Sequence, residues 1–584
     1  MIKKIFRQMM VTQIISAMTV TLCMLIDSIM IGRFLGVDSM AAYGLATPVL
    51  LVFAAFGSML SAGVQVMCGK TMGAGDREGT NACFTVSVLL AGAVSAVGLF
   101  LVILFTDPIC TLLGAGSPTP DNKVFFLTRD YIRGFIIGAP AFISAQIMVP
   151  YMQISGNRTR LVVAVLAMTV GDVLFDILNV FVFNGGTFGM GLASSLSYYV
   201  AFVIGVLYFF KKDCMFKLRR AGVKLRSCLE LLKYGVPTVI NQISLVLLVF
   251  VLNKVLLDVG KETAVAAYSV ISTVGNICYC FGSGVGSVAL LLSSIFYSDE
   301  DVTALRSLVK TMTYYAVLLD VIVTVVVALL SPLLARLFLA DDPAARETAS
   351  LGVRLFVLSL VPCSLNTTFK NYFQGVNRTG FTQAISIMQN FTFTALFAIL
   401  LSRFLSATGV WLAFVCGEGL TFLIVSAVVW KNNGKISVSA DAYSMLPKNF
   451  GAHESDYLEM TINKLEDVVE ASERAGRFCR SHGESERNCA VIALCVEEMT
   501  GNIVEHGFTK DNKEHSIELR LLFKDGKRVI RIRDNCVNFD PTAYLKLHTD
   551  DDPGAHVGIR MVMKMVKESN YLNSLGLNNL TLVM

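Results

Sequence analysis

Charged residues are scarce in this sequence. Asp, Glu, Lys and Arg make up only 16% of its 584 residues, whereas 54% are hydrophobic, and a soluble protein usually carries about a quarter charged residues. The scarcity is uneven, because charges are confined to short clusters between Val11 and Trp430 but recur every few positions from Lys431 onward. This composition excludes an ordinary soluble protein and predicts a polytopic membrane unit followed by a soluble tail with one modest core.

Three absent motifs narrow the function further. The fourteen cysteines include no C-x-x-C pair and no zinc-ligand spacing, which favours reduced thiols that only pack. The basic N-terminus leads into a hydrophobic run that is too long for a signal peptide and lacks an A-x-A cleavage site, so we expect a first membrane span there. The Gly-Lys-Thr of "MCGKTMGAGD" is not a phosphate loop, because Val64 stands where that loop needs its first glycine, and this argues against an ATP-driven pump.

Hydrophobic runs long enough to cross a bilayer recur throughout the charge-poor region. A helical span needs about 20 apolar residues. The runs of that length are 9–31, 42–67, 83–106, 126–150, 161–183, 190–210, 236–257, 266–296, 309–338, 351–374, 381–404 and 408–430. They predict an all-α membrane unit of about twelve spans. Lys and Arg gather before the first span and after the fourth, sixth and twelfth, so we expect this side and both termini to face the cytoplasm of a cell membrane.

The membrane unit also contains an internal repeat. "QISGNRTR" at 153–160 recurs as "QGVNRTGF" at 374–381, and "AAYGLATPV" at 41–49 recurs as "AAYSVISTV" at 266–274, at nearly equal offsets. The repeat predicts two six-helix lobes, as in secondary transporters that bind their substrate between repeats. The expected parts are an N lobe over 1–210, an inter-lobe loop over 211–235, a C lobe over 236–430, a linker over 431–454 and a soluble domain over 455–584.

Several carboxylates fall inside the predicted spans. Asp27 lies in the first span, and Asp172 and Asp176 lie one helical turn apart in the fifth. An ionised carboxylate in the middle of a membrane helix costs about 2.5–3.5 kcal/mol, so these residues need a partner, a proton or a bound cation. We therefore expect this cluster to bind Na⁺ or H⁺, with Asp320 and Glu418 as further candidates in the second lobe.

Longer motifs point to a family. "IDSIMIGRFLGVDSMAAYGLATPV", "GKTMGAGDREG" and "GDVLFDILNVFVFNGGTFGMGLASSLS" resemble the MATE (multidrug and toxic compound extrusion) family. The resemblance implies a V of two lobes that exports small, amphipathic substrates, often organic cations, in exchange for Na⁺ or H⁺. Asp27 and Asp176 match the acidic positions of one subgroup, whereas Asp172 stands where that subgroup has asparagine, which leaves the coupling ion open.

A flippase for lipid-linked precursors is an alternative with the same fold. Such a protein would favour a cationic central cavity for a pyrophosphate headgroup. Within the predicted spans, Lys254 is the base that stands out for this role.

The tail combines strand and helix patterns. "YLEMTIN", "SIELRLLFK" and "KRVIRIRD" alternate with period two, and Asp525-Gly526 between the last two favours a hairpin. Helices are expected over 465–482, over 485–507 and near 556–568, followed by two closing strands. These elements predict an α/β sandwich, in which helices cover one face of an antiparallel sheet.

Three further motifs follow one another in the tail. "LCVEEMTGNIVEHGF", in which Glu498, Asn502 and His506 recur every four residues on one helix face, is followed by "RDNCVNFDP" and "GAHVGIRMVMKMV". In this order the motifs resemble the GHKL ATPase superfamily, and within it serine kinases of the anti-sigma-factor type. The resemblance implies that Glu498 activates the attacking hydroxyl, that Asn502 holds Mg²⁺ and that Asp534 receives the adenine amino group. The residues implied to bind ATP are Asn502, Asp534, Phe539, Gly554 and Gly558.

Two residues depart from this pattern. Cys536 and His556 stand where the superfamily has glycine. A Cβ atom is costly where the backbone needs a positive φ or must approach a phosphate closely. We therefore expect weaker nucleotide binding than the motifs alone would imply.

Taken together, the motifs favour an exporter of small molecules, coupled to Na⁺ or H⁺, whose cytoplasmic domain binds ATP and regulates transport or signals. Its expected partners are the substrate, membrane lipid and a cytoplasmic protein, without nucleic acid. A membrane receptor whose tail phosphorylates a Ser or Thr of a partner is the alternative from another functional class.

Overall fold

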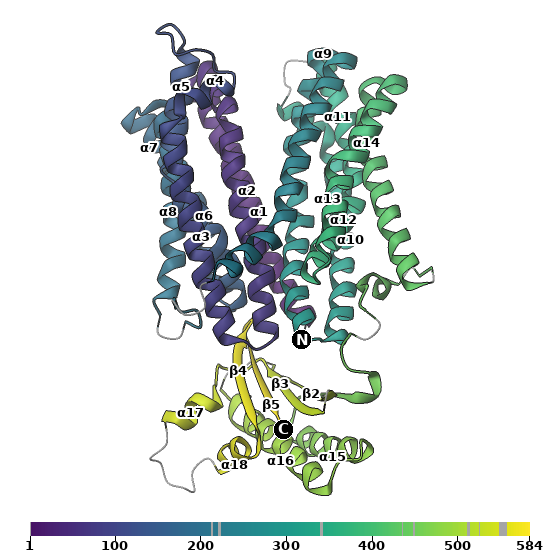
Figure 1. The fold of residues 1–584 in the computed structure, drawn as a ribbon. Coiled ribbons are helices and arrows are strands. Elements are labelled where there is room, and N and C mark those ends of the chain that lie inside the picture. Colours follow the sequence, from purple (N-terminus) through teal and green to yellow (C-terminus); the bar gives the residue numbers. More distant parts are fainter. Residues whose placement is uncertain are drawn as a thin grey trace.

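The computed structural model describes residues 2–211, 214–219, 224–338, 343–434, 436–437, 439–447, 450–510, 514–524, 526–547 and 557–584. It has a membrane unit of long helices, arranged in two lobes, and a small α/β domain beneath them (Figure 1). The N-terminus and the α/β domain lie at the same end of the membrane unit, which we call the tail end. The lobes diverge from this end, so that together they form a V.

The first lobe consists of long helices joined by short turns, as its unbroken apolar runs predict. Asp76 begins one of these helices by accepting a hydrogen bond from the backbone N–H of Gly79 at 2.8 Å. The elements of the lobe are α1 (Ile2–Met30), the π-helical turn η1 (Ile31–Leu35), α2 (Val37–Gly73), α3 (Arg77–Leu104), α4 (Thr106–Leu112), α5 (Lys123–Ile136), α6 (Ala139–Ile154), α7 (Arg158–Leu178), the π-helical turn η2 (Asn179–Phe183) and α8 (Gly186–Phe209).

The second lobe begins with α9 (Leu225–Ser298), which contains two apolar spans, Leu225–Val259 and Ala267–Ser298. The remaining elements of the lobe are α10 (Val302–Phe338), α11 (Pro343–Phe356), the short 3₁₀ helix η3 (Val357–Ser359), α12 (Leu360–Gly375), α13 (Thr379–Ile387), the π-helical turn η4 (Met388–Thr392) and α14 (Phe393–Asn433).

The number of spans comes close to the expected twelve. In the described parts of the chain, 10 helices are long and apolar enough to cross a membrane, or 11 if the bent pair α5 and α6 is one span. The last of them, Thr379–Asn433, has 55 residues, and a helix of that length measures about 80 Å, well over the ~30 Å of a hydrocarbon core. Ser406 interrupts it with φ 50° and ψ −135°. This break separates the eleventh and twelfth spans that the sequence predicts.

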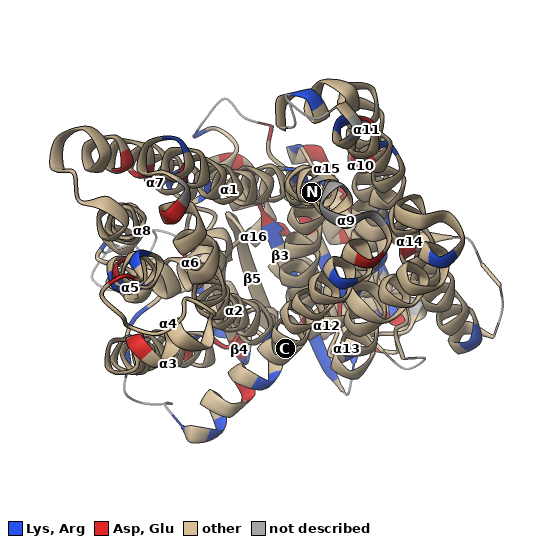
Figure 2. Cartoon of the chain, turned by 90° about the horizontal axis from the view of Figure 1, so that it is seen from above, with Lys and Arg blue, Asp and Glu red and all other residues tan. Residues whose placement is uncertain are grey.

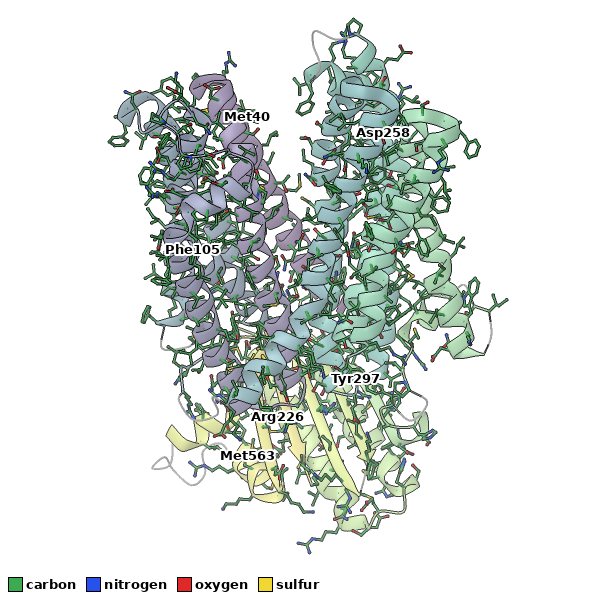
Figure 3. All side chains as sticks on the ribbon, turned by 45° about the horizontal axis from the view of Figure 1, so that its top comes forward. Met40, Phe105, Arg226, Asp258, Tyr297 and Met563 are labelled. Carbon is green, nitrogen blue, oxygen red and sulfur yellow. The ribbon has the colours of Figure 1, made fainter. Side chains whose placement is uncertain are left out.

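The α/β domain lies at one end of the lobes. In the view from above, most residues of the membrane helices are uncharged (Figure 2). The same view shows the α/β domain beneath both lobes. Met40 and Asp258 lie far from the tail, whereas Arg226 and Tyr297 lie next to it (Figure 3).

Close packing of α2 against α9 joins the two lobes at the tail end. A Cβ atom on Gly69 would collide with the Ser294 hydroxyl, and one on Gly73 would collide with the backbone carbonyl of Ile295. The Ser294 hydroxyl also donates a hydrogen bond to the carbonyl of Gln65 at 2.9 Å. The two glycines therefore allow a helix of one lobe to touch a helix of the other.

A linker with the short 3₁₀ helices η5 (Ala440–Ser444) and η6 (Glu454–Asp456) leads to the α/β domain. Its sheet has the order β1-β2-β3-β5-β4, and all neighbouring strands are antiparallel. The elements of the domain are β1 (Tyr457–Ile462), α15 (Leu465–Ser481), α16 (Glu486–Asn502), the π-helical turn η7 (Ile503–Gly507), β2 (Ile517–Lys524), β3 (Lys527–Asp534), α17 (Pro541–Leu547), α18 (Val557–Met565), β4 (Glu568–Ser574) and β5 (Leu577–Val583).

The alternating strands divide the sheet into an apolar face and a basic face. Leu519 and Leu521 of β2 and Ile532 of β3 join the buried core with α15 and α16. Because successive side chains point to opposite faces, the intervening Arg520 and Arg531 point away from those helices. The predicted antiparallel sheet with helices on one face is thus confirmed, and its other face is turned toward the membrane unit.

Candidate functional site

The first lobe holds a cluster of buried carboxylates. Asp27 of α1 is 7% exposed, and Asp172 and Asp176 of α7 are 2% and 0% exposed. The carboxyl group of Asp27 lies close enough to those of Asp172 and Asp176 for hydrogen bonds. Such a bond needs a proton on one of the two carboxyl groups, because an ionised carboxylate can only accept. The structure therefore brings together the three aspartates named from the sequence.

Few donors satisfy this cluster. Ser194 of α8 donates its hydroxyl proton to Asp27 Oδ2 at 3.2 Å. The other Asp27 oxygen, one oxygen of Asp172 and both oxygens of Asp176 are buried without a hydrogen-bond partner. A buried polar atom without a partner is costly, and a proton on the cluster would remove part of that cost.

The carboxylates of the second lobe occupy other helices. Asp320 lies in α10 and Glu418 in α14, and they are 2% and 6% exposed. The side-chain amide of Asn366 donates to Glu418 Oε2 at 2.9 Å, whereas Asp320 Oδ2 has no hydrogen-bond partner. Each lobe thus has its own buried acids.

In the described parts of the chain, no group of three His, Cys, Asp or Glu side chains is arranged to hold a metal ion.

A cavity of about 560 Å³ lies between the lobes, within the size range of small-molecule pockets. Lys370 of α12 lines it and is the only charged side chain among its described lining residues. Lys254, the base that stood out for the flippase alternative, is exposed and does not line it. Sequence reasoning missed Lys370, although a lysine inside the apolar run 351–374 was a visible signal.

In the tail, α16 positions the predicted Glu498 and Asn502. The Asn502 side-chain amide donates to the carbonyl of Glu498 at 2.6 Å. Gly558 in the first turn of α18 lies against Glu498, because a Cβ atom there would collide with the Glu498 carboxylate. Gly554 and His556 lie outside the described residues. Two of the three motifs thus meet at one place.

The expected row of three polar residues on one helix face is wrong at its end. The α-helix changes to the π-helical turn η7 at Ile503, and the hydrogen bonds of this turn join residues five rather than four positions apart. Its register therefore differs from that of α16, and the His506 side chain is exposed.

Asp534 ends β3 and is 3% exposed. Its Oδ1 atom accepts hydrogen bonds from the backbone N–H of Cys536 at 2.9 Å and from the Asn578 amide at 2.8 Å. Burial raises the pKa of the Asp534 carboxyl, while both hydrogen bonds oppose the rise. Phe539 is 39% exposed, with its ring centroid 5.2 Å from that of Tyr544.

The departure at Cys536 is accommodated without backbone strain. Cys536 is not among the described residues with a positive φ, so the expected strain at this position is absent. Its side chain packs against Gly507, where a Cβ atom would lie 3.1 Å from the Cys536 sulfur. A glycine on the facing turn thus leaves room for the cysteine.

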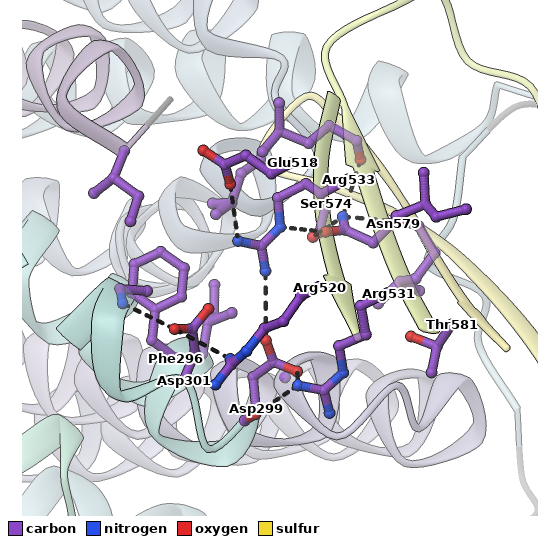
Figure 4. Close-up of a pocket in the computed structure, with 18 of the residues that line it drawn as sticks. Phe296, Asp299, Asp301, Glu518, Arg520, Arg531, Arg533, Ser574, Asn579 and Thr581 are labelled. Atoms are coloured by element: carbon purple, nitrogen blue, oxygen red, sulfur yellow. Dashed lines mark hydrogen bonds and ion pairs between the residues drawn. The ribbon is translucent and has the colours of Figure 1, made fainter. Parts of the chain in front are cut away.

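The basic face of the sheet contacts the α9–α10 loop of the second lobe (Figure 4). Arg531 Nη1 lies 2.6 Å from Asp299 Oδ1, and Arg533 Nη2 lies 3.4 Å from Asp299 Oδ2. Arg520 Nη1 lies 3.2 Å from Asp301 Oδ1. Burial raises the pKa of Asp299 to about 6, although the neighbouring arginines oppose this rise. The contact is a buried acidic and basic cluster.

Loops of the first lobe contact the same domain. The backbone N–H of Leu575, between β4 and β5, donates to the carbonyl of Ile154 at 2.5 Å, and Arg158 donates to the carbonyl of Leu575 at 2.9 Å. Asn570 donates to the carbonyl of Gly75 in the α2–α3 turn. The α/β domain therefore bridges both lobes at the tail end.

Comparison with known families and proteins agrees with this architecture. The MatE family model matches residues 13–178 and 237–400, more than half of the chain, and the histidine kinase-like ATPase domain model matches residues 462–584. The Multidrug export protein MepA of Staphylococcus aureus (strain bovine RF122 / ET3-1) is 21% identical over 403 residues, covering 68% of this chain and 87% of that protein. MepA of Staphylococcus saprophyticus is 21% identical over 409 residues, covering 69% and 88%.

Solved structures show the same fold for the membrane unit. The outward-facing conformation of a multidrug resistance MATE family transporter of the MOP superfamily superposes with a TM-score of 0.68 at 20% identity, covering 72% of this chain and 94% of that one. A crystal structure of MATE in complex with MaL6 gives the same values. The chain therefore belongs to the MatE family, and a histidine kinase-like ATPase domain follows its membrane unit.

Proposed function

We propose that this protein exports small amphipathic molecules in exchange for Na⁺ or H⁺, and that its tail binds Mg²⁺ and ATP in the cytoplasm to regulate transport. The observation that carries the proposal is the buried cluster of Asp27, Asp172 and Asp176, in which four carboxylate oxygens have no hydrogen-bond partner. The relatives named as multidrug export proteins support the export of small molecules.

Ion exchange follows from the energetics of this cluster. Three carboxylates buried near one another repel when all are ionised, and a proton or cation between them removes that cost. The conformation that buries the three carboxylates would be stable only with the ion bound. The ion would therefore bind this conformation more tightly than one that exposes the carboxylates, and this difference in affinity is the requirement for coupling. Release of the ion would then favour the conformation in which the carboxylates separate or meet water.

The coupling can be tested in proteoliposomes with an imposed Na⁺ or pH gradient and a fluorescent amphiphile. We expect Asp27→Asn and Asp176→Asn to abolish gradient-driven transport. Asp258→Asn is the matched control, because Asp258 is exposed at the far end of the second lobe. Transport by the native chain that ignores the collapse of both gradients would contradict ion coupling.

The residues of the tail fit a nucleotide. Asp534 is a buried acceptor at the end of a strand, and Gly558 lets the Glu498 carboxylate lie against the first turn of α18, where a Cβ atom would collide with it. When bound, ATP with Mg²⁺ would supply a phosphoryl group for transfer, or would act as a ligand that orders the pocket. Glu498 and Asn502 would hold their polar groups at its phosphate end, and Asp534 would accept the adenine amino group.

Nucleotide titration of the full-length chain tests this part separately. We expect Mg²⁺ and ATP to bind the native chain, and Asp534→Asn to weaken binding at least about tenfold, since a hydrogen bond to a charged group contributes about 1.5–3 kcal/mol. Glu505→Gln is the matched control, because Glu505 is exposed in η7 beside the site. No binding at millimolar ATP would reduce the tail to a scaffold. Phosphorylation of a Ser or Thr partner without any effect on transport would instead favour a receptor.

Contacts with both lobes support a regulatory role for the tail. The same domain that holds the nucleotide residues contacts Asp299 in one lobe and Ile154 in the other. A ligand that changes this domain can therefore bias the lobes without touching the transport site, provided that its affinity differs between their conformations.

A further inference from the structure

Lys370 gives the central cavity a positive charge. It lies in α12, is 8% exposed, and lines the cavity of about 560 Å³ between the lobes. All other described lining residues are apolar or uncharged polar ones, and the aspartates of the first lobe are not among them. A molecule that enters this space therefore meets one fixed cation and no fixed anion from the described lining.

The hydrogen-bond partners of Lys370 are neutral. Its ammonium donates to Asn241 Oδ1 at 2.5 Å and to Gln389 Oε1 at 3.1 Å. An ammonium group has three N–H donors, so these two bonds leave one donor for a ligand. Within the described residues, no carboxylate forms an ion pair with Lys370.

Both partner amides are fixed in place by their own hydrogen bonds. Asn241 Oδ1 also accepts from the Asn390 amide at 2.6 Å. The Gln389 amide donates to the Cys363 carbonyl at 3.2 Å and to the Thr367 hydroxyl at 3.0 Å, which turns its oxygen toward Lys370. The lysine is therefore held by a preorganised set of dipoles rather than by chance contacts.

Glu418 of the same lobe does not neutralise this charge. The field of Glu418 reaches Lys370, but the Glu418 carboxylate accepts from Asn366 and forms no ion pair with the lysine. A buried cation without a counter-ion is unfavourable. An anion supplied by a ligand would complete the site.

We propose that Lys370 binds an oxyanion of the transported substrate, a carboxylate or a phosphate on an amphipathic molecule. The proposal rests on the export function proposed above and specifies its substrate class. The apolar part of the substrate would lie on the opposite wall, where Met24, Met168 and Phe142 offer adaptable and aromatic surface. Organic cations, the substrates implied by the family resemblance, would be repelled by Lys370.

Two dyes with the same fluorophore and opposite charge test the proposal on the full-length chain. Dansylglycine carries a carboxylate and dansylcadaverine an ammonium group. We expect the native chain to prefer dansylglycine, and Lys370→Gln to weaken its binding about tenfold while binding of dansylcadaverine stays equal or tightens. Lys370→Arg should retain the preference, because it keeps the charge. Lys254→Gln, which changes an exposed lysine of the same lobe, should change neither affinity.

Equal losses of both dyes in Lys370→Gln, or a native preference for the cationic dye, would overturn the proposal. A second experiment in lipid nanodiscs distinguishes two sources of the oxyanion, a lipid headgroup and a free amphiphile. Displacement of dansylglycine by phosphatidylglycerol in nanodiscs would identify a lipid headgroup, whereas binding that ignores this lipid would identify a free amphiphile.

Transport assays separate this proposal from the function on which it rests. If dansylglycine binds through Lys370 but no ion gradient moves it, coupled export fails and the anion site stands. If gradients move dansylcadaverine alone and Lys370→Gln leaves that movement unchanged, coupled export stands and the anion site fails.

Discussion

Asp299 and Arg531 form an ion pair across the junction between the membrane unit and the tail, with Arg531 Nη1 2.6 Å from Asp299 Oδ1. The same arginine nitrogen donates to the Asp299 backbone carbonyl at 2.7 Å. Asp299 is 8% exposed, so its charge depends on the tail for compensation. Contacts between domains of one chain are otherwise often weak, and this pair links two parts of the protein that could move separately.

Removal of the arginine should detach the tail. We expect Arg531→Gln to weaken docking by about 3 kcal/mol, because the Asp299 carboxylate then stays buried with less compensation. Asp299→Asn in the same chain should restore part of the loss. Energy transfer between dyes at the exposed positions Arg226 and Glu466 would report docking. Arg474→Gln is the control, because its ion pair with Glu470 is exposed and such pairs contribute about 0–1 kcal/mol.

Docking should also depend on pH. Burial raises the pKa of Asp299 from the ordinary 3.8 to about 6 in the docked state, so the docked state binds this proton more tightly than a detached state in which Asp299 faces water. Docking should be strongest near pH 4 and weaken as pH rises to 6, by about 3 kcal/mol at most. Above pH 6 the dependence should level off. Asp299→Asn should flatten the curve measured with the same dyes, and an unchanged curve would assign the effect to another group.

Close contact between the lobes at Gly73 gives a third prediction. A methyl group in Gly73→Ala would collide with the Ile295 carbonyl, a backbone atom that cannot rotate away. We expect α2 and α9 to separate at the tail end, at a cost of about 1–3 kcal/mol. Cys68, which is 0% exposed on α2, should then react faster with a maleimide, as mass spectrometry would show. Gly44→Ala on the same helix, where a Cβ atom meets nothing within 4 Å, should leave the rate unchanged.

Asp172, the third aspartate of the first lobe, should lower the stability of the folded chain while it contributes to ion exchange. We expect Asp172→Asn to stabilise the chain by about 1–3 kcal/mol, because the amide removes one buried charge and can donate to a carboxylate that lacks a partner. Thermal unfolding in detergent would measure the gain, with exposed Asp258→Asn as the control. The number of ions exchanged per substrate should fall in the same variant. A lower melting temperature would show that Asp172 is held by a bond that the amide cannot replace.

Local patterns were sufficient to predict much of this molecule. Period-two alternation in β2 and β3 distinguishes Ile532, which joins the core, from Arg531, which faces the membrane unit. The spacing of Glu498 and Asn502 holds because both lie within one α-helix. Asp27 and Asp176 could be named because a carboxylate inside an apolar run is costly in any fold.

The remaining features depend on contacts between distant segments. Lys370 stands out as a lysine inside an apolar run, but its place at the cavity could not be predicted, because the cavity forms only when both lobes pack around it. Asp299 and Arg531 lie far apart in the sequence, and neither stretch carries a signal for the other. The register change at Ile503 also has no local marker, since its residues suit an α-helix as well as a π turn.

Cys536 offers a direct test of the nucleotide pocket. Among the cysteines of the tail, Cys479, Cys489 and Cys495 are buried, whereas Cys536 is partly exposed, and its backbone N–H donates to Asp534. A nucleotide whose adenine contacts Asp534 would cover the neighbouring thiol. We expect Mg²⁺ and ATP to slow alkylation of Cys536 by N-ethylmaleimide about tenfold when about nine tenths of the protein is liganded, since the alkylation rate falls with the fraction of unliganded protein. The three buried cysteines are internal controls in the same digest.

Two variants decide what such protection means. Asp534→Asn should weaken the protection without changing alkylation in the absence of nucleotide, because the thiol keeps its position against Gly507. Cys536→Gly restores the residue of the superfamily, and it should bind nucleotide more tightly while destabilising the domain by up to about 1 kcal/mol through added backbone freedom. If Mg²⁺ and ATP protected Cys536 equally well in the native chain and in Asn502→Ala, adenine binding would remain and the metal site at Asn502 would have to be abandoned.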